Sequence, residues 1–130
     1  MKLEYLDATG NGAFPNASPA RLVRLSQFNE EQVALLIGSI QRLISSKNDV
    51  WLNELPFIDA INCKVKLVIA DKDDGILPVG NDELFVCALT TSSYEHMVEI
   101  ITHVKTGYNW LTPGEYLDDP AFLISPFGTW

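Results

Sequence analysis

The stretch from residue 62 to 105 constrains the fold of this 130-residue chain more than any other. Alternating apolar and charged side chains over residues 63–69 predict a strand that is covered on one face. An acidic turn, residues 71–75, interrupts the pattern, and the apolar run 84–89 predicts a second, more buried strand. We expect these two strands to pair as a hairpin with a long loop. Residues 92–104 then place apolar side chains at helical spacing, so one face of this predicted helix must be buried.

Both long helices predicted in the chain begin with capping-box spacing. Ser92 precedes Glu95 by three positions, and Asn29 stands in the same relation to Gln32. In such a pair each side chain satisfies a backbone N–H group that the first helical turn leaves unpaired. Apolar residues at helical spacing follow both pairs, which predicts two amphipathic helices packed on a core.

Shorter elements complete the predicted fold. Residues 2–6 and 22–26 have strand patterns and are separated by a loop rich in turn-forming residues, while residues 121–125 predict a short C-terminal strand. Pro56 prevents a long helix through residues 49–58, so we expect a helical turn there that closes one end of the core.

The order of elements indicates an internal duplication. Laying residues 2–46 over residues 66–110 brings strand over strand, loop over loop and capped helix over capped helix. Six of the 45 aligned pairs are identical, about twice the number that average composition gives by chance; an equal order of elements without common ancestry is the alternative. We predict an α+β fold with about five mainly antiparallel strands in one sheet and two long helices on one face, arranged as two tandem ββα units plus the C-terminal strand.

Length and charge limit the classes of function. Residues 1–130 are enough for one globular domain and too few for two. The net charge of −8, with nine lysine and arginine residues, argues against a nucleic-acid-binding surface and favours a basic protein partner. Acidic residues interrupt the N-terminal segment where a signal peptide needs an apolar core, and no window reaches the roughly 18 apolar residues of a membrane span. The expected location is the cytoplasm.

The two cysteines are expected to be buried free thiols. Cys63 and Cys87 fall in predicted strands and lie out of register in the expected hairpin, too far apart for a disulfide. A covered thiol acts as a small apolar side chain rather than as a nucleophile.

The acidic turn supplies the candidate metal ligands Asp71, Asp73, Asp82 and Glu83. Carboxylates on alternate residues followed by a glycine are typical of the start of a calcium loop. The pattern departs from an EF-hand because Gly75 comes one residue early, the flanking elements are strands, and the twelfth position is Asp82 instead of Glu. A solvated turn is the alternative.

Three residues that can bind zinc or transfer protons lie on one edge of the second helix. The two histidines, His96 and His103, are about 10.5 Å apart along the axis, too far to share one ion, so only one of them could act together with Glu99. We expect a solvated helix edge and no cofactor. The sequence contains no nucleotide-binding loop, nucleophile elbow or paired-cysteine zinc motif, which argues against an enzyme.

These features favour a non-enzymatic protein-binding or inhibitor module. Small acidic immunity proteins of the bacterial cytoplasm, which neutralise a basic effector, are the general kind of protein with this size and charge. The candidate partner-binding residues are Leu35, opposite the core stripe of the first helix, and Trp130; an isolated exposed leucine and an indole packed on the core are the alternatives. A small enzyme or ligand-binding domain with a pocket at the acidic loop is the second hypothesis. A homodimer that buries Leu35 or an edge strand is the third.

Overall fold

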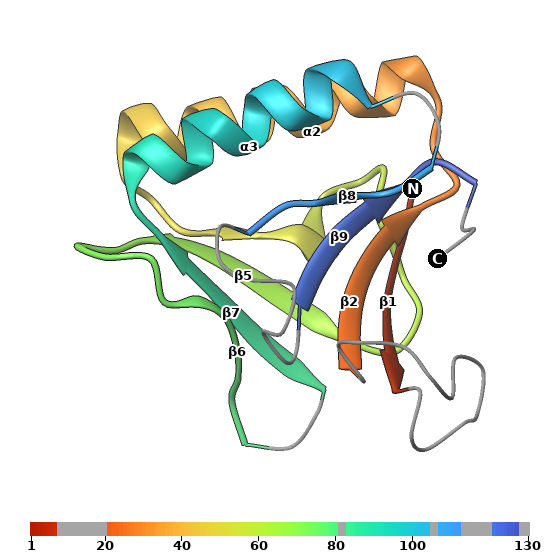
Figure 1. Ribbon diagram of the computed structural model, residues 1–130, viewed down its shortest axis with the longest axis horizontal. Coiled ribbons are helices and arrows are strands. Elements are labelled where there is room, and N and C mark those ends of the chain that lie inside the picture. Colours follow the sequence, from red (N-terminus) through yellow and green to blue (C-terminus); the bar gives the residue numbers. More distant parts are fainter. Residues whose placement is uncertain (8–20, 81–82, 105–106, 113–120, 128–130) are drawn as a thin grey trace.

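The computed structural model describes residues 1–7, 21–80, 83–104, 107–112 and 121–127, which form two β-sheets and two long helices (Figure 1). Sheet A has five strands in the order β4-β1-β2-β9-β8. Their bounds are β1 Lys2–Asp7, β2 Arg21–Ser26, β4 Asp59–Ala60, β8 Asn109–Trp110 and β9 Ala121–Ser125. β2 is antiparallel to β1 and parallel to β9, so the sheet is mixed.

Sheet B has four strands in the order β3-β5-β7-β6. Their bounds are β3 Val50–Trp51, β5 Lys64–Ile69, β6 Gly75–Pro78 and β7 Leu84–Leu89. The central pair, β5 and β7, is parallel, and β6 is antiparallel to β7. A single 3-10 turn, η1 Leu52–Glu54, follows β3 and supplies the helical turn predicted in this segment.

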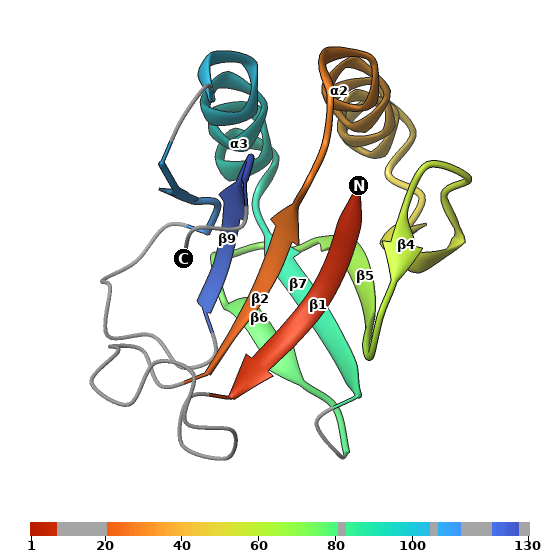
Figure 2. The same ribbon diagram turned by 90° about the vertical axis from the view of Figure 1, so that its right-hand side faces the viewer.

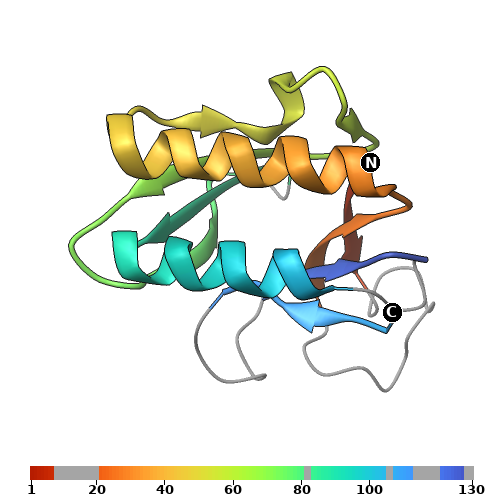
Figure 3. The same cartoon turned by 90° about the horizontal axis from the view of Figure 1, so that it is seen from above.

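The helices α2 Glu30–Ser46 and α3 Thr91–His103 lie side by side and run in opposite directions (Figure 3). The Lys47 ammonium, after the end of α2, donates to the Thr91 hydroxyl at the start of α3 over 2.9 Å. In the part of the chain that the structure describes, no helix is long and apolar enough to cross a membrane.

One core joins both sheets to the helices. Figure 2 shows strands of sheet A crossing in front of strands of sheet B, beneath the two helices. The inner faces of the sheets meet the buried stripes of the helices, and the cluster includes Leu3, Leu25, Val65, Leu67, Phe85, Leu36, Ile40, Leu43, Met97 and Ile101. The apolar positions predicted from periodicity therefore either lie in this buried cluster or pack against it.

The α+β class and its two long helices are confirmed, but the single, mainly antiparallel sheet is wrong. The strands form two mixed sheets. The hairpin expected between residues 63–69 and 84–89 is also wrong, because β6 is the antiparallel neighbour of β7. β5 instead pairs with β7 in parallel, with Leu67 opposite Cys87.

The connectivity repeats in a way that differs from the predicted tandem units. β1-β2-α2-β3-β5 and β6-β7-α3-β8-β9 each begin with an antiparallel pair, cross by a helix to the other sheet and end in another antiparallel pair. β5 then pairs in parallel with β7, and β9 with β2. The two halves thus exchange their last two strands. Residues 66–110 are not the structural counterpart of residues 2–46, because β6, and not β5, takes the place of β1 beside its antiparallel partner.

The N-terminal cap predicted for α2 is present, whereas the cap predicted for α3 is not. At α2 the capping box is confirmed: Asn29 Oδ1 accepts from the Gln32 N–H at 2.9 Å, and Gln32 Oε1 accepts from the Asn29 N–H at 3.1 Å. At α3 the predicted cap, Ser92, is wrong. The N-cap is Thr90, whose hydroxyl accepts from the Ser93 N–H at 3.2 Å.

Candidate interaction surfaces

The Asp73 carboxylate is a structural part of the start of α3. Its Oδ1 accepts from the Thr90 N–H at 2.9 Å and from the Thr90 hydroxyl at 3.1 Å, and its Oδ2 accepts from the Ser93 hydroxyl at 2.7 Å. The Thr90 N–H bond and then the Ser93 bond hold the pKa of Asp73 below its usual range. A negative charge at a helix N-terminus is also stabilised by the helix dipole. Asp73 therefore ties the β5–β6 loop to α3.

The other candidate metal ligands do not gather around Asp73 in the described residues. Asp71 is exposed in the same loop. Glu83 precedes β7, whereas the loop lies at the far end of that strand, where the Ala70 N–H donates to the Leu89 carbonyl at 2.9 Å. Asp82 lies outside the described residues. Within those residues no group of three or more His, Cys, Asp or Glu side chains could hold a metal ion.

The histidine edge of α3 faces solvent. His96 Nδ1 lies 3.9 Å from Glu99 Oε2, and both side chains are about two-thirds exposed or more. His103, in the last turn, is also exposed. These residues lie on an open helix surface, where water competes for every polar contact.

Both cysteines are free and buried, as predicted. Burial raises the pKa of the Cys63 thiol to about 12, with a smaller contribution from the charge of Glu4. Burial likewise raises the pKa of Cys87 to about 12. Both thiols are therefore protonated at neutral pH, and a protonated thiol is a poor nucleophile.

Tyr94 lies in the apolar stripe of α3 but carries a buried hydroxyl group, whose polar contacts the apolar pattern of the helix does not predict. Its ring is fully buried, and its hydroxyl lies 2.9 Å from the Val68 carbonyl and 2.7 Å from the Cys87 carbonyl. Burial raises the pKa of Tyr94, so the hydroxyl keeps its proton. The hydroxyl joins α3 to the neighbouring strands β5 and β7, which is a structural role.

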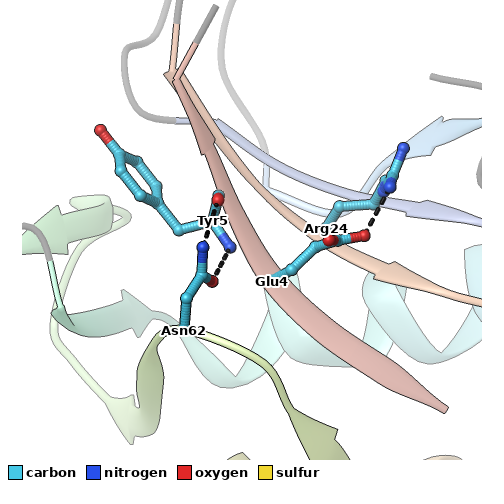
Figure 4. Close-up of polar contacts among 4 residues, drawn as sticks. All are labelled: Glu4, Tyr5, Arg24 and Asn62. Atoms are coloured by element: carbon cyan, nitrogen blue, oxygen red, sulfur yellow. Dashed lines mark hydrogen bonds and ion pairs between the residues drawn. The ribbon is translucent and has the colours of Figure 1, made fainter. Parts of the chain in front are cut away.

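Polar contacts also fix the position of β1 (Figure 4). Glu4 and Arg24 form a buried ion pair between β1 and β2. Asn62 pairs through its side-chain amide with the backbone of Tyr5: Oδ1 accepts from the Tyr5 N–H at 2.7 Å, and Nδ2 donates to the Tyr5 carbonyl at 2.9 Å. The amide thus extends the short β4–β1 ladder along β1.

A groove of about 580 Å³ opens between the start of α2 and the end of α3; we call it the helix-end groove. Its most exposed apolar residue is Phe127, of which 69% is accessible. Glu30, in the first turn of α2, lines the groove, and the exposed Glu31 follows it. The lining residues are Phe28, Asn29, Glu30, Val33, Thr102, Val104, Pro126 and Phe127. The groove therefore combines apolar walls with an acidic edge.

The predicted partner residues have different outcomes. Leu35 is 47% exposed on the solvent side of α2, one helical turn after Glu31, as its position opposite the core stripe predicts. Trp130 lies outside the described residues. Sequence reasoning did not predict the helix-end groove, because its lining comes from three segments that are far apart in the chain. The one local indication of it is the aromatic residue Phe127, which follows Pro126 after the last predicted strand.

A second open surface is the outer face of sheet B, which we call the sheet B face. Strand register aligns one row across its four strands, Trp51, Lys66, Val86 and Leu77. The next row contains Lys64, Leu84 and Val79, because Lys64 pairs with Leu84 and the Val79 N–H donates to the Leu84 carbonyl at 2.8 Å. Leu77 and Val79 are 44% and 45% exposed.

The charges on the sheet B face are unevenly paired. Lys66 Nζ lies 3.1 Å from Asp49 Oδ2 and 5.5 Å from the centre of a Trp51 ring, so its charge is compensated. The Lys64 ammonium forms no ion pair with another described residue. Lys64 also borders a cleft of about 600 Å³, which Ile61, Glu83 and Leu84 line at this end of the face.

A scan of the chain against models of known protein families finds no match, and a search of curated proteins finds none either. The two open surfaces and the charge of the chain are therefore the features from which a function can be inferred.

Proposed function

We propose that the protein is a non-enzymatic protein-binding module of the inhibitor kind, which binds a basic protein partner at the helix-end groove. The observation that carries this proposal is the exposed Phe127 ring beside Glu30 in a groove of about 580 Å³. An apolar ring with this exposure, bordered by a carboxylate, suits a partner that presents both an apolar stem and a positive charge.

Lysine or arginine side chains of the partner meet these requirements. Their methylene stems would pack against Phe28 and Val33, and their charged ends would lie near Glu30 and Glu31 or over the Phe127 ring. The net charge of −8 supports the same partner class, because an acidic protein attracts a basic one over long range and raises the rate of encounter.

The alternative is a small enzyme or ligand-binding domain with a pocket at the acidic loop. Two observations make this second hypothesis less favourable. Both carboxylate oxygens of Asp73 already accept hydrogen bonds at the start of α3. The hydrophobic environment of Cys63 and Cys87 keeps both thiols protonated. The binding module needs neither group to react.

The proposal is tested by comparing variants of the immobilised chain in a lysate of the native host. Phe127→Ser and the pair Glu30→Gln with Glu31→Gln change the groove, while Leu77→Asp is a matched change at an exposed apolar residue elsewhere. We expect the native chain and the Leu77 variant to retain the same basic protein, and both groove variants to lose most of it. High salt should release this protein, since charge pairs hold part of the contact.

Circular dichroism spectra of all variants control for folding. Equal retention by the native chain and both groove variants would refute the groove as the binding site. An acidic retained protein would refute the partner class.

A further inference from the structure

We propose that two asparagine side chains, Asn53 and Asn62, close the strand edges that border the cleft of about 600 Å³. By doing so they block strand addition, the pairing of another extended segment with an open edge. The inference goes beyond the proposed function, because neither residue lines the helix-end groove. It gives both asparagines, which line the same cleft, one common role.

Both sheets end near this cleft in an edge strand that is too short to cover its neighbour. β4 has two residues and pairs with Lys2 and Leu3, although β1 continues to Asp7. β3 also has two residues, beside the six of β5. The chain turns into η1 directly after β3, and after β4 it crosses to sheet B within residues 61–63. A strand edge left uncovered in this way is a template on which another chain can pair.

The amide of Asn62 supplies the peptide group that a longer β4 would provide. The last backbone bond of the β4–β1 ladder runs from the Ile61 N–H to the Leu3 carbonyl, at 2.9 Å. Tyr5 is the next residue of β1 on this edge, because alternate residues of a strand bond to the same neighbour. Its N–H and its carbonyl are both bound by Asn62, at 2.7 and 2.9 Å (Figure 4). A side-chain amide has the donor and the acceptor of a peptide group, so it closes this position.

Asn53 acts in the same way on sheet B. Trp51 pairs with Lys66 in antiparallel register, so a longer β3 would place Leu52 beside Val65. Leu52 begins η1 instead, and the Val65 N–H donates to Asn53 Oδ1 at 3.2 Å. A side-chain amide therefore replaces a main-chain partner at both strand edges of the cleft.

These contacts remove the gain that an incoming strand would need. A segment that paired with β1 at Tyr5 and with β5 at Val65 would first displace three hydrogen bonds. The bonds that it formed at these two residues would only replace the lost ones. A hydrogen bond adds to the stability of a complex only when it exceeds the one it replaces, so the closed edges disfavour association.

Amide hydrogen exchange of the full chain tests the closure of the edges. The Tyr5 amide in Asn62→Ala, and the Val65 amide in Asn53→Ala, should exchange at least about fivefold faster than in the native chain. Asn53→Asp should keep the Val65 amide protected, because a carboxylate oxygen can take the place of Oδ1. Unchanged exchange at either amide in its alanine variant would overturn the proposal.

Sedimentation velocity from about 5 to 500 µM tests the block of strand addition. The double variant Asn53→Ala with Asn62→Ala should form larger species than the native chain as its concentration rises. Asn53→Asp with Asn62→Asp should sediment like the native chain, because both acceptors remain and a charge on a strand edge disfavours pairing. Asn48→Ala, at an exposed asparagine after α2, is the matched control. A double alanine variant that sediments like the native chain would refute the block.

The concentration dependence of exchange separates strand addition from a general loss of stability. If another strand pairs with β1, the Tyr5 amide of Asn62→Ala should exchange more slowly at about 500 µM than at about 5 µM. Association after unfolding would accelerate exchange along the whole chain without this recovery, and that result would count against the proposal. The single variant changes one exposed side chain, so this measurement remains possible if the double variant does not fold.

Discussion

Replacing Asp73 by alanine should destabilise the protein by about 1.5 kcal/mol at neutral pH. The substitution removes three hydrogen bonds to Thr90 and Ser93. Loss of a helix cap costs about 0.5–2 kcal/mol, and loss of a negative charge at a helix N-terminus costs about 0.3–1 kcal/mol. Asp73 is solvent-exposed and Thr90 still caps the helix, so we take a value in the lower half of the combined range of about 0.8–3 kcal/mol. The expected fall in melting temperature is about 5 °C for a chain of this size.

The pH dependence of this effect has a definite sign. The pKa of Asp73 is lowered in the folded protein, so its contribution to stability is fully present above the unfolded pKa, about 3.9. That contribution is lost as the pH falls through the lower, folded pKa. The free energies of unfolding of the native chain and the Asp73→Ala variant should therefore differ by a constant amount between about pH 5 and pH 8 and converge below about pH 4.

Urea unfolding followed by far-UV circular dichroism measures both effects. Asp71→Asn is the matched control, because Asp71 is exposed in the same loop; its effect should stay within about 0.5 kcal/mol. Asp73→Asn, which keeps one acceptor but no charge, should fall between the control and the alanine variant. The reasoning fails if Asp71→Asn costs as much as Asp73→Ala, or if the alanine variant remains equally destabilised at low pH.

Three further predictions follow from the buried polar groups and the acidic loop. Tyr94→Phe keeps the ring but leaves the Val68 and Cys87 carbonyls without their donor, so it should cost about 1–3 kcal/mol in urea unfolding; an unchanged midpoint would contradict this. Cys63 and Cys87 should resist a thiol reagent at about pH 8 in the native state and react in urea, because burial raises the pKa of each to about 12; rapid labelling of the native chain would contradict their burial. Calcium should not raise the melting temperature, since both Asp73 oxygens already accept hydrogen bonds, and a rise abolished by Asp73→Asn would show a metal site in the loop.

Elements whose signals lie within a few residues were predictable. The capping box of α2 needs only Asn29 and Gln32, and both hydrogen bonds form as expected. Alternation in β5 also identifies the buried residues, because a strand covered on one face repeats every two residues. In both cases the sequence neighbours that carry the pattern are also the neighbours in space.

Elements that depend on distant residues were not predictable in the same way. Ser92 and Glu95 have the spacing of a capping box, yet the N-cap of α3 is Thr90, whose N–H and hydroxyl are bound by Asp73 from another loop. β6 was missed because it has four residues, begins with glycine and ends with proline, which are typical of a loop. Without β6, the pair β5 and β7 is naturally interpreted as a hairpin.

The candidate surfaces depend on this missed strand. In a single sheet covered by two helices, one outer face remains, and the apolar residues of β6 would belong to a loop. The exchange of strands between the two halves instead creates two sheets whose inner faces share one core, so each sheet has its own outer face. On sheet A, Leu22 and Leu123 of that face are buried, while on sheet B, Leu77 and Val79 are exposed. Since burial of apolar area is the main favourable term in association, the unequal exposure makes the outer face of sheet B the more open apolar surface of the two.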